Sequence, residues 1–321
     1  MVIDRREISS LLWLAKEAKL DDRLLGNILV GIRTGELIYS VVQIPKSDGG
    51  KRELHVPPPL VCIVQRAINK NVLSWISAHP CAFGFSGGGI VDAITPHLGS
   101  KILFSFDVVD AFDQISSGAV LRGLTEGRAV WIGGGRGVHY EYGHLSWFAA
   151  NMVAEICTWE NSLPQGAPTS PRLFDQAFKV ADTVLAKLAE NVGGVFTRYA
   201  DNIFFSLRDK THFPPKLERA VLRVLYRGEY GWHKLSVRRM DNGAVRMLGL
   251  NVMEGKISTP RDYKRRLRLA QHHVRYLLDR DLPFEEAWLR LKGQMGFGSL
   301  GILPNALVEG YASLEKEIEG M

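Results

Sequence analysis

Two aspartates stand where β-strands could present them for metal chemistry. Asp107 follows the apolar run KILFSF at 101–106, and Asp201 lies inside the apolar hairpin pattern VFTRYADNIFFSL at 195–207. If the two elements pair in one sheet, carboxylates 94 residues apart (201 − 107) come together, and they repel each other unless cations lie between them. Two Mg²⁺ ions held in this way serve nucleotidyl transfer, one activating the attacking 3′-hydroxyl and the other stabilising the leaving pyrophosphate.

Each aspartate, taken alone, fits a simpler interpretation equally well. An Asp after a buried strand is often a turn residue or a helix cap, and Asp and Asn favour hairpin turns. The order of the other segments along the chain is therefore what favours the metal-binding hypothesis.

Composition bounds the class of protein. With 321 residues, 46% hydrophobic and 23% charged, the chain can bury a substantial core in one large domain or in two to three lobes. The sequence contains no run of 18 apolar residues, and the charged start argues against a secretory signal, so we expect a soluble, cytoplasmic protein without a membrane partner. Three widely spaced cysteines fit neither a disulfide framework nor a zinc site.

The charge is concentrated near the C-terminus. The net charge is +6 and the pI is near 9.2, which favours a polyanionic partner. Residues 256–280 alone hold eight Lys or Arg against two Asp, a local +6. This segment is the candidate nucleic-acid surface.

Hydrophobic periodicity predicts elements that could position these residues. Near the N-terminus we expect an amphipathic helix with Ile8, Leu11, Leu12 and Ala15 on one face, then a helix at 22–31. Two strands joined by a turn at 47–50 follow, then a helix after residue 60, a Gly-rich loop at 84–89, and a helix at 90–97. Farther along, the pattern predicts a helix capped by Ser170, a helix ending near Glu229, short strands around 247–252 and a basic helix whose apolar face carries Tyr263, Leu267, Ala270, Val274 and Leu277.

The order of motifs resembles the reverse transcriptases of bacterial retrons and related phage-defence systems. The resemblance extends from about Tyr39 to Pro304, and its most specific block is LPQGAPTSP at 163–171. In chain order the motifs are RELHVPPP, VQRAI, a Gly-rich loop, FDVVDAF, LPQGAPTSP, YAD and LGL, followed by the basic helix. The resemblance implies an RNA-directed DNA polymerase with an α+β right-hand fold. Residues 1–100 would form N-terminal helices and fingers, together with part of 115–160; residues 101–254 would be mainly palm and residues 255–321 thumb.

The resemblance also implies roles for individual residues. Asp107, Asp201 and the carbonyl of Val108 would bind Mg²⁺, or Mn²⁺. Asp110, Ala111 and Phe112 would line the nucleotide site, where the Phe112 ring would collide with a ribose 2′-hydroxyl and so select dNTPs. The Asp110 carboxylate itself is expected to be structural.

Further expected contacts to the nucleotide come from two other segments. Gln165 and Gly166 would form a turn against nucleotide and template, where glycine permits close backbone approach. Lys46, Lys51 and Arg52 would supply cations to the triphosphate, although a solvated hairpin turn is the alternative for these three.

The thumb would track the template–primer backbone through a basic helix face. Its candidate residues are Lys264, Arg265, Arg268, His272 and Arg275. The implied partners are a template RNA, expected to be a structured non-coding RNA, the DNA product and dNTPs; a toxin or effector protein is a further candidate.

Four features depart from the family pattern. Asn202 replaces a usual second Asp, which would weaken metal affinity or favour Mn²⁺, and the loop at 84–92 lacks Lys and Arg. Arg239 stands where a lysine general acid is expected, and arginine is a poor proton donor. The segments AITPH and MLG replace the retron signatures NAxxH and VTG, which favours a retron-like relative, such as a stand-alone defence enzyme.

Three functions stay open on the sequence. The first is RNA-templated DNA synthesis, in which Asn202 would join Asp107 and Asp201 as a catalytic residue. The second is a degenerate polymerase that acts as an RNA-binding scaffold. The third is template-independent or protein-primed DNA synthesis.

Overall fold

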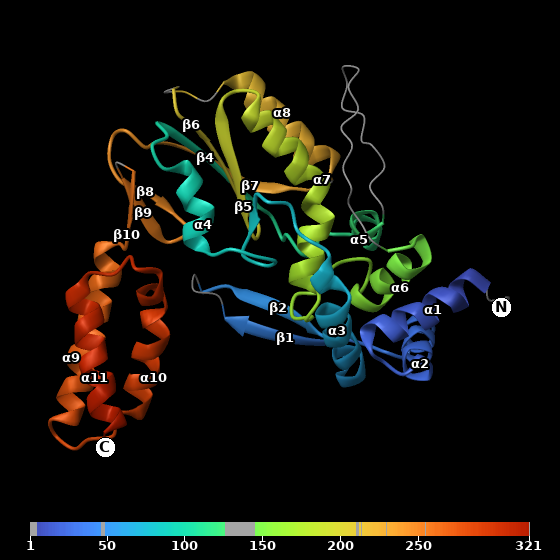
Figure 1. Cartoon of the computed structure of the whole chain (residues 1–321), viewed down its shortest axis with the longest axis horizontal. Coiled ribbons are helices and arrows are strands. Elements are labelled where there is room, and N and C mark those ends of the chain that lie inside the picture. The colour runs from blue at the N-terminus through green and yellow to red at the C-terminus, as the bar shows by residue number, and fades with distance from the viewer. Residues whose placement is uncertain are drawn as a thin grey trace.

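The computed structural model describes residues 5–45, 49–125, 145–209, 212, 214–228, 230–253 and 255–320, apart from the side chains of 232–235 and 297–299. Figure 1 shows helices at the N-terminal end, a hairpin beside them, a central sheet backed by long helices, and a C-terminal group of helices. Among the described helices, none is both long and apolar enough to cross a bilayer.

The N-terminal helices α1 (Arg5–Ala18) and α2 (Asp22–Arg33) pack against α3 (Pro59–Asn71) and α6 (Trp147–Cys157). The two predicted helices are confirmed, but the predicted apolar face of the first is partly wrong. Ile8 and Leu12 are 46% and 49% exposed, whereas Leu14 and Ala18 are fully buried. The buried stripe is rotated because it faces α3 and α6, which the local period cannot indicate.

The predicted hairpin near residue 50 is also confirmed. Strands β1 (Ser40–Pro45) and β2 (Lys51–Val56) pair antiparallel with Ser40 opposite Val56 and Pro45 opposite Lys51. Most of their side chains are exposed, so the hairpin projects from the body as a two-stranded arm (Figure 1). At the turn, residues 46–48 lie outside the described part of the chain.

The central sheet has the strand order β3-β5-β6-β4-β7. Its members are β3 (Ala82–Phe83), β4 (Ile102–Val108), β5 (Gly194–Tyr199), β6 (Asn202–Leu207) and β7 (Trp232–Arg239). All neighbours are antiparallel except β3 and β5, which are parallel. Strand β3 joins this sheet and α4 (Ile90–Ile94) packs on it, so residues before 101 also contribute to the central sheet and its surroundings.

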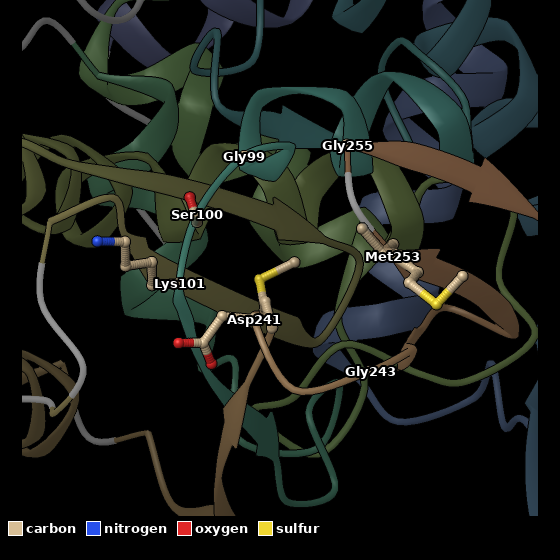
Figure 2. A pocket seen from close by; sticks show the side chains of 9 residues that line it. Gly99, Ser100, Lys101, Asp241, Gly243, Met253 and Gly255 are labelled. Atoms are coloured by element: carbon tan, nitrogen blue, oxygen red, sulfur yellow. The ribbon is translucent and has the colours of Figure 1, made fainter.

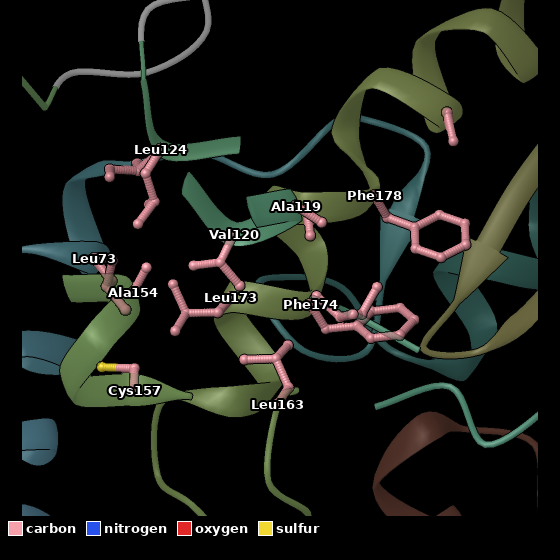
Figure 3. Packing of buried hydrophobic residues seen from close by; sticks show 14 of the residues in the cluster. Leu73, Ala119, Val120, Leu124, Ala154, Cys157, Leu163, Leu173, Phe174 and Phe178 are labelled. Atoms are coloured by element: carbon pink, nitrogen blue, oxygen red, sulfur yellow. The ribbon is translucent and has the colours of Figure 1, made fainter. Parts of the chain in front are cut away.

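Long helices cover one face of the sheet. Helix α7 (Ser170–Glu190) packs against α5 (Ser117–Leu124), α8 (Pro215–Arg227) and β5. Alternate residues of β4, including Phe104 and Phe106, join these helices in the main core, part of which Figure 3 shows from close by. Ser170 is the first helical residue rather than the cap, because its Oγ donates to the carbonyl of Pro164 at 2.8 Å and so braces the preceding turn.

The opposite face carries a smaller core shared with α4 and a three-stranded sheet. That sheet has the order β10-β9-β8, from β8 (Val245–Met247), β9 (Leu250–Met253) and β10 (Lys256–Ser258). It leads into the C-terminal helices α9 (Arg261–Leu278), α10 (Glu285–Gln294) and α11 (Asn305–Glu319), which have their own core. The predicted apolar face of α9 is confirmed there, since Leu267 and Val274 are fully buried.

Candidate active site

The structure brings Asp107 and Asp201 to the same edge of the central sheet. Strand β4 pairs antiparallel with β6, with Asp107 directly opposite Asn202, and the Val108 N–H donates to the Asp201 carbonyl at 3.1 Å. Residues opposite each other in such a pair have Cα atoms about 5 Å apart. The predicted pairing of the two elements in one sheet is therefore confirmed.

Strand alternation explains why Asp107 is open to solvent inside an apolar strand. Phe104, Phe106 and Val108 point into the main core, and Asp107 points to the other face, where it is exposed. Asp201 is half-buried in the turn between β5 and β6. One carboxylate thus comes from a strand end and the other from a hairpin tip, on the solvent side of the sheet.

The hairpin tip is a two-residue turn formed by Ala200 and Asp201. Ala200 has φ +53°, a left-handed conformation that costs a non-glycine residue about 1 kcal/mol or more. The Asn202 side-chain amide donates to Asp201 Oδ1 at 3.2 Å. Asn202 therefore supports the Asp201 carboxylate, which a second carboxylate at this position would repel.

The donor set fits a hard divalent cation. Two carboxylates and a backbone carbonyl are oxygen ligands of the kind that Mg²⁺ binds, and Mg²⁺ usually takes its remaining ligands from water and substrate phosphates. Within the described residues there is no group of three or more His, Cys, Asp or Glu side chains placed to hold a metal.

Asp110 has a structural place near these two aspartates. It has φ +38°, and its carbonyl accepts hydrogen bonds from the Asp113 and Gln114 N–H groups at 2.9 and 3.2 Å, which closes the turn after β4. Burial and the neighbouring Asp110 charge raise the pKa of Asp113. Asp110 therefore shapes the loop that presents Phe112.

Phe112 packs in an aromatic cluster beside the sheet edge. Its ring centroid lies 5.7 Å from that of Phe85 and 5.4 Å from that of Phe174, and Ala111 next to it is only 5% exposed. Phe85 comes from the Gly-rich loop, in which Gly84 has φ +100° and lies so close to the hairpin that a Cβ there would be 3.2 Å from the Tyr199 ring. The loop thus packs against the hairpin of Asp201.

The turn of LPQGAPTSP contacts the fingers hairpin. The His55 N–H of β2 donates to the Gln165 carbonyl at 2.6 Å. Gly166 has φ +115°, and a Cβ there would lie 3.3 Å from the His55 carbonyl oxygen, so the position requires glycine. The structure therefore ties this turn to the strand that carries Lys51 and Arg52.

The candidate triphosphate cations lie at the far end of that hairpin. Lys51 and Arg52 are exposed and stand opposite Pro45 and Ile44. Lys51 is four positions before His55, which corresponds to about 13 Å along an extended strand. Lys46, the third candidate, lies outside the described residues.

Arg239 is not brought to the site. On β7 it stands opposite Ile102, at the start of β4, whereas Asp107 stands opposite His233. Five residues along a strand correspond to about 17 Å. The Arg239 guanidinium pairs with Asp241 at 2.9 Å, and Asp241 lines a separate pocket with Ser100 and Lys101 (Figure 2).

The basic residues of α9 divide into exposed and paired groups. Arg265, Arg268 and His272 are exposed, and Lys264 is half-buried. Arg275 instead forms an ion pair with Glu317 of α11, which ties the helices of the thumb together. The face available to a polyanion is thus narrower than the sequence suggests.

One buried group near the site went unnoticed in the sequence. Arg198 of β5 is fully buried and pairs with Asp175 and Asp182 of α7. The sequence pattern does indicate this buried ion pair. Arg198 shares a strand face with the buried Phe196, and Asp175 and Asp182 are seven residues apart, which puts them on one face of a helix.

Comparisons with known proteins agree with this geometry. The model of the reverse transcriptase (RNA-dependent DNA polymerase) family matches residues 44–252, which is more than half of the chain. The chain is 22% identical to the retron Ec86 reverse transcriptase of Escherichia coli over 80% of its own length and 77% of that enzyme's. It is 31% identical to the retron Mx65 reverse transcriptase of Myxococcus xanthus over 73% of its own length, but spans 55% of that enzyme.

Solved structures give more distant likenesses. A foamy viral protease-reverse transcriptase in complex with double-stranded DNA has 18% identity and a TM-score of 0.47, with 91% of this chain and 42% of that chain covered. Telomerase from Candida albicans has 12% identity and a TM-score of 0.47, with 87% and 54% covered. On the family match, and with retron enzymes as its curated relatives, the chain belongs to the retron-type reverse transcriptases.

Proposed function

We propose that the protein is an RNA-directed DNA polymerase that adds dNTPs to a 3′-hydroxyl on an RNA template. The observation that carries the proposal is the convergence of Asp107 and Asp201 at one sheet edge, through the register of β4 with β6. Phe112, five residues after Asp107, packs against Phe174 of α7, the helix that follows the Gln165–Gly166 turn. Family membership supports the same chemistry.

In this proposal the carboxylates of Asp107 and Asp201 and the Val108 carbonyl hold the divalent cations. When bound, Mg²⁺ or Mn²⁺ makes the 3′-hydroxyl more acidic and neutralises charge on the leaving pyrophosphate. Asn202 orients the Asp201 carboxylate through its amide hydrogen bond. The single Asn in place of Asp lowers the negative charge of the site, so we expect a higher metal requirement than in a three-carboxylate site.

The substrate class follows from the groups around the cations. The Phe112 ring, fixed by its contacts with Phe85 and Phe174, would stand against the sugar and exclude a 2′-hydroxyl. The Gln165–Gly166 turn would lie under the nucleotide and template, and Lys51 and Arg52 would meet the triphosphate when the exposed hairpin arm closes. The exposed arginines of α9 would contact the phosphates of an RNA–DNA duplex.

Primer extension by the purified chain tests the proposal. We expect DNA synthesis from dNTPs on primed RNA in Mg²⁺ or Mn²⁺, little synthesis from rNTPs, and loss of synthesis in Asp107→Asn, which keeps the side-chain shape and removes the charge. Asp22→Asn, an exposed aspartate at the start of α2, is the matched control and should retain activity. Absence of synthesis by the wild-type chain in either metal, or full activity of Asp107→Asn, contradicts the proposal.

The same samples separate the scaffold alternative, which Asn202 and the absence of Lys and Arg from the loop at 84–92 favour. A scaffold would bind RNA in a salt-sensitive manner, with the same affinity in the wild type and Asp107→Asn, and would synthesise nothing. Reactions without added template, followed by sequencing of the products, identify template-independent synthesis.

A further inference from the structure

Arg198 lies three residues before Asp201 and is fully buried. Its Nε and Nη2 donate to the two carboxylate oxygens of Asp182 at 2.8 and 2.7 Å, and its Nη1 donates to Asp175 Oδ1 at 3.0 Å. Nη1 also donates to the carbonyl of Ala200 at 2.9 Å. The guanidinium therefore joins helix α7 directly to the backbone of the turn that carries Asp201.

The surroundings of Arg198 favour one fixed geometry. Its guanidinium carbon lies 5.0 Å from the ring centroid of Phe178 and 5.4 Å from that of Phe174, so the planar group is packed against aromatic rings of α7. Burial lowers the pKa of Arg198, but the Asp182 and Asp175 carboxylates outweigh burial and hold the pKa above its usual range. The side chain is thus a permanent cation with four hydrogen bonds in a fixed fork.

The turn itself is held from both sides. The Ala200 N–H donates to the Phe83 carbonyl of β3 at 3.1 Å, and the Ala200 carbonyl accepts from Arg198. Ala200 adopts the left-handed conformation, which alanine does not favour, so outside contacts must maintain it. The contact from Arg198 comes from a charged side chain that is itself fully buried.

Stability alone explains this arrangement poorly. Replacing a buried charge group by apolar residues of similar volume is often neutral or stabilising, so a buried triad is weak support for a purely stabilising role. Buried polar groups fix a specific geometry in some proteins, and here the geometry that Arg198 fixes is that of the turn carrying Asp201.

We propose that Arg198 is a positioning residue that fixes Asp201 relative to Asp107 by clamping the Ala200 turn to α7. The inference rests on the proposed role of the two aspartates in binding a divalent cation. Helix α7 begins at Ser170, four positions after Gly166, so the same helix follows the nucleotide-side turn and is bonded through Arg198 to the metal-side turn. The clamp thereby keeps two parts of the site in register with each other.

The test measures Mn²⁺ binding to the purified full chain by electron paramagnetic resonance, together with primer extension as a function of metal concentration. Arg198→Lys keeps the charge but replaces the fork by one nitrogen, which cannot reach Asp182, Asp175 and the Ala200 carbonyl together. We expect at least a fivefold weaker Mn²⁺ affinity and a matching rise in the metal concentration for half-maximal synthesis, with the KM for dNTP changed less.

Two further variants distinguish positioning from general destabilisation. Asp182→Asn keeps the side-chain volume and one acceptor, so it should fold even where Arg198→Lys does not, and we expect an intermediate loss of Mn²⁺ affinity. Leu225→Ala removes a fully buried side chain of α8 that has no hydrogen bond to the turn. It should lower the melting temperature and leave Mn²⁺ affinity unchanged in the folded protein.

The outcomes separate this inference from the proposed function. Wild-type Mn²⁺ affinity in folded Arg198→Lys or Asp182→Asn, or an equal loss in Leu225→Ala, overturns the positioning role. A wild-type chain that binds Mn²⁺ through Asp107 but synthesises nothing contradicts the proposed function and leaves the clamp to be judged by Mn²⁺ affinity alone. A wild-type chain that does not bind Mn²⁺ overturns both.

Discussion

Gly123 of α5 lies directly against the backbone of α7, and substituting it should destabilise the protein measurably. An ideal Cβ at this position would lie 2.4 Å from the Gln176 carbonyl oxygen, 2.6 Å from its carbon and 2.9 Å from the Ala177 nitrogen. All three atoms are backbone, so no side-chain rotation can relieve the clash. Restoring an ordinary 3.4 Å contact with the oxygen would require the helices to separate by about 1 Å.

A matched control lies in the same helix. Gly118 would place its Cβ 3.5 Å from the flexible Arg122 side chain and 3.8 Å from Ser116 Oγ, both ordinary contacts. Alanine at either position gains up to about 1 kcal/mol of helix propensity. The difference between the variants therefore isolates the overpacking penalty, which is about 1–3 kcal/mol and should lie near the upper value for a backbone clash.

Thermal and urea unfolding followed by circular dichroism measure this difference. Since 1 kcal/mol shifts the melting temperature of a domain of this size class by about 2–4 °C, Gly123→Ala should melt roughly 6–12 °C below Gly118→Ala. Equal melting temperatures for the two variants would refute the reasoning, because they would mean that α5 and α7 part without cost. Because α7 holds Asp175 and Asp182, folded Gly123→Ala should also show reduced synthesis.

Four further results are expected. Gly166→Ala should lower synthesis more than stability, because alanine at φ +115° strains the turn bonded to His55; unchanged primer extension at a normal melting temperature would contradict this. Burial lowers the pKa of His97 to about 3, so between pH 6.5 and 3 the unfolded chain binds a proton there that the folded chain does not. The free energy of unfolding should therefore fall with decreasing pH by up to about 1.4 kcal/mol per pH unit in this range. Urea titrations at several pH values should show a smaller dependence of the unfolding free energy on pH in His97→Gln. Phe112→Val should raise rNTP use relative to dNTP by about tenfold, equivalent to about 1.4 kcal/mol, in competition assays; an unchanged ratio would remove Phe112 as the sugar selector. Arg268→Gln should reduce the salt dependence of RNA–DNA duplex binding by about one phosphate contact, whereas Arg290→Gln on α10 should not.

Local patterns in the amino-acid sequence were enough to predict part of the fold. Two β-rich runs on either side of a polar turn at Asp201 predicted the hairpin, and the apolar run before Asp107 predicted strand β4. The apolar stripe of α9 predicted which face is buried, because a period of 3.6 residues depends on neighbouring positions alone. The ordered motifs then indicated the family, which the comparison with the reverse transcriptase model confirmed.

Contacts between distant segments set the remaining features, and these required the folded chain. Arg239 follows the hairpin in sequence, yet the antiparallel register of β7 carries it to the opposite end of β4 from Asp107. Which site a strand residue reaches depends on how its strand is aligned with the neighbouring strand, and that register depends on the packing of the whole sheet. The pairing of Arg198 with Asp175 and Asp182 arises for the same reason. A buried arginine is stable only beside its carboxylates, and only the packing of α7 on β5 brings them together.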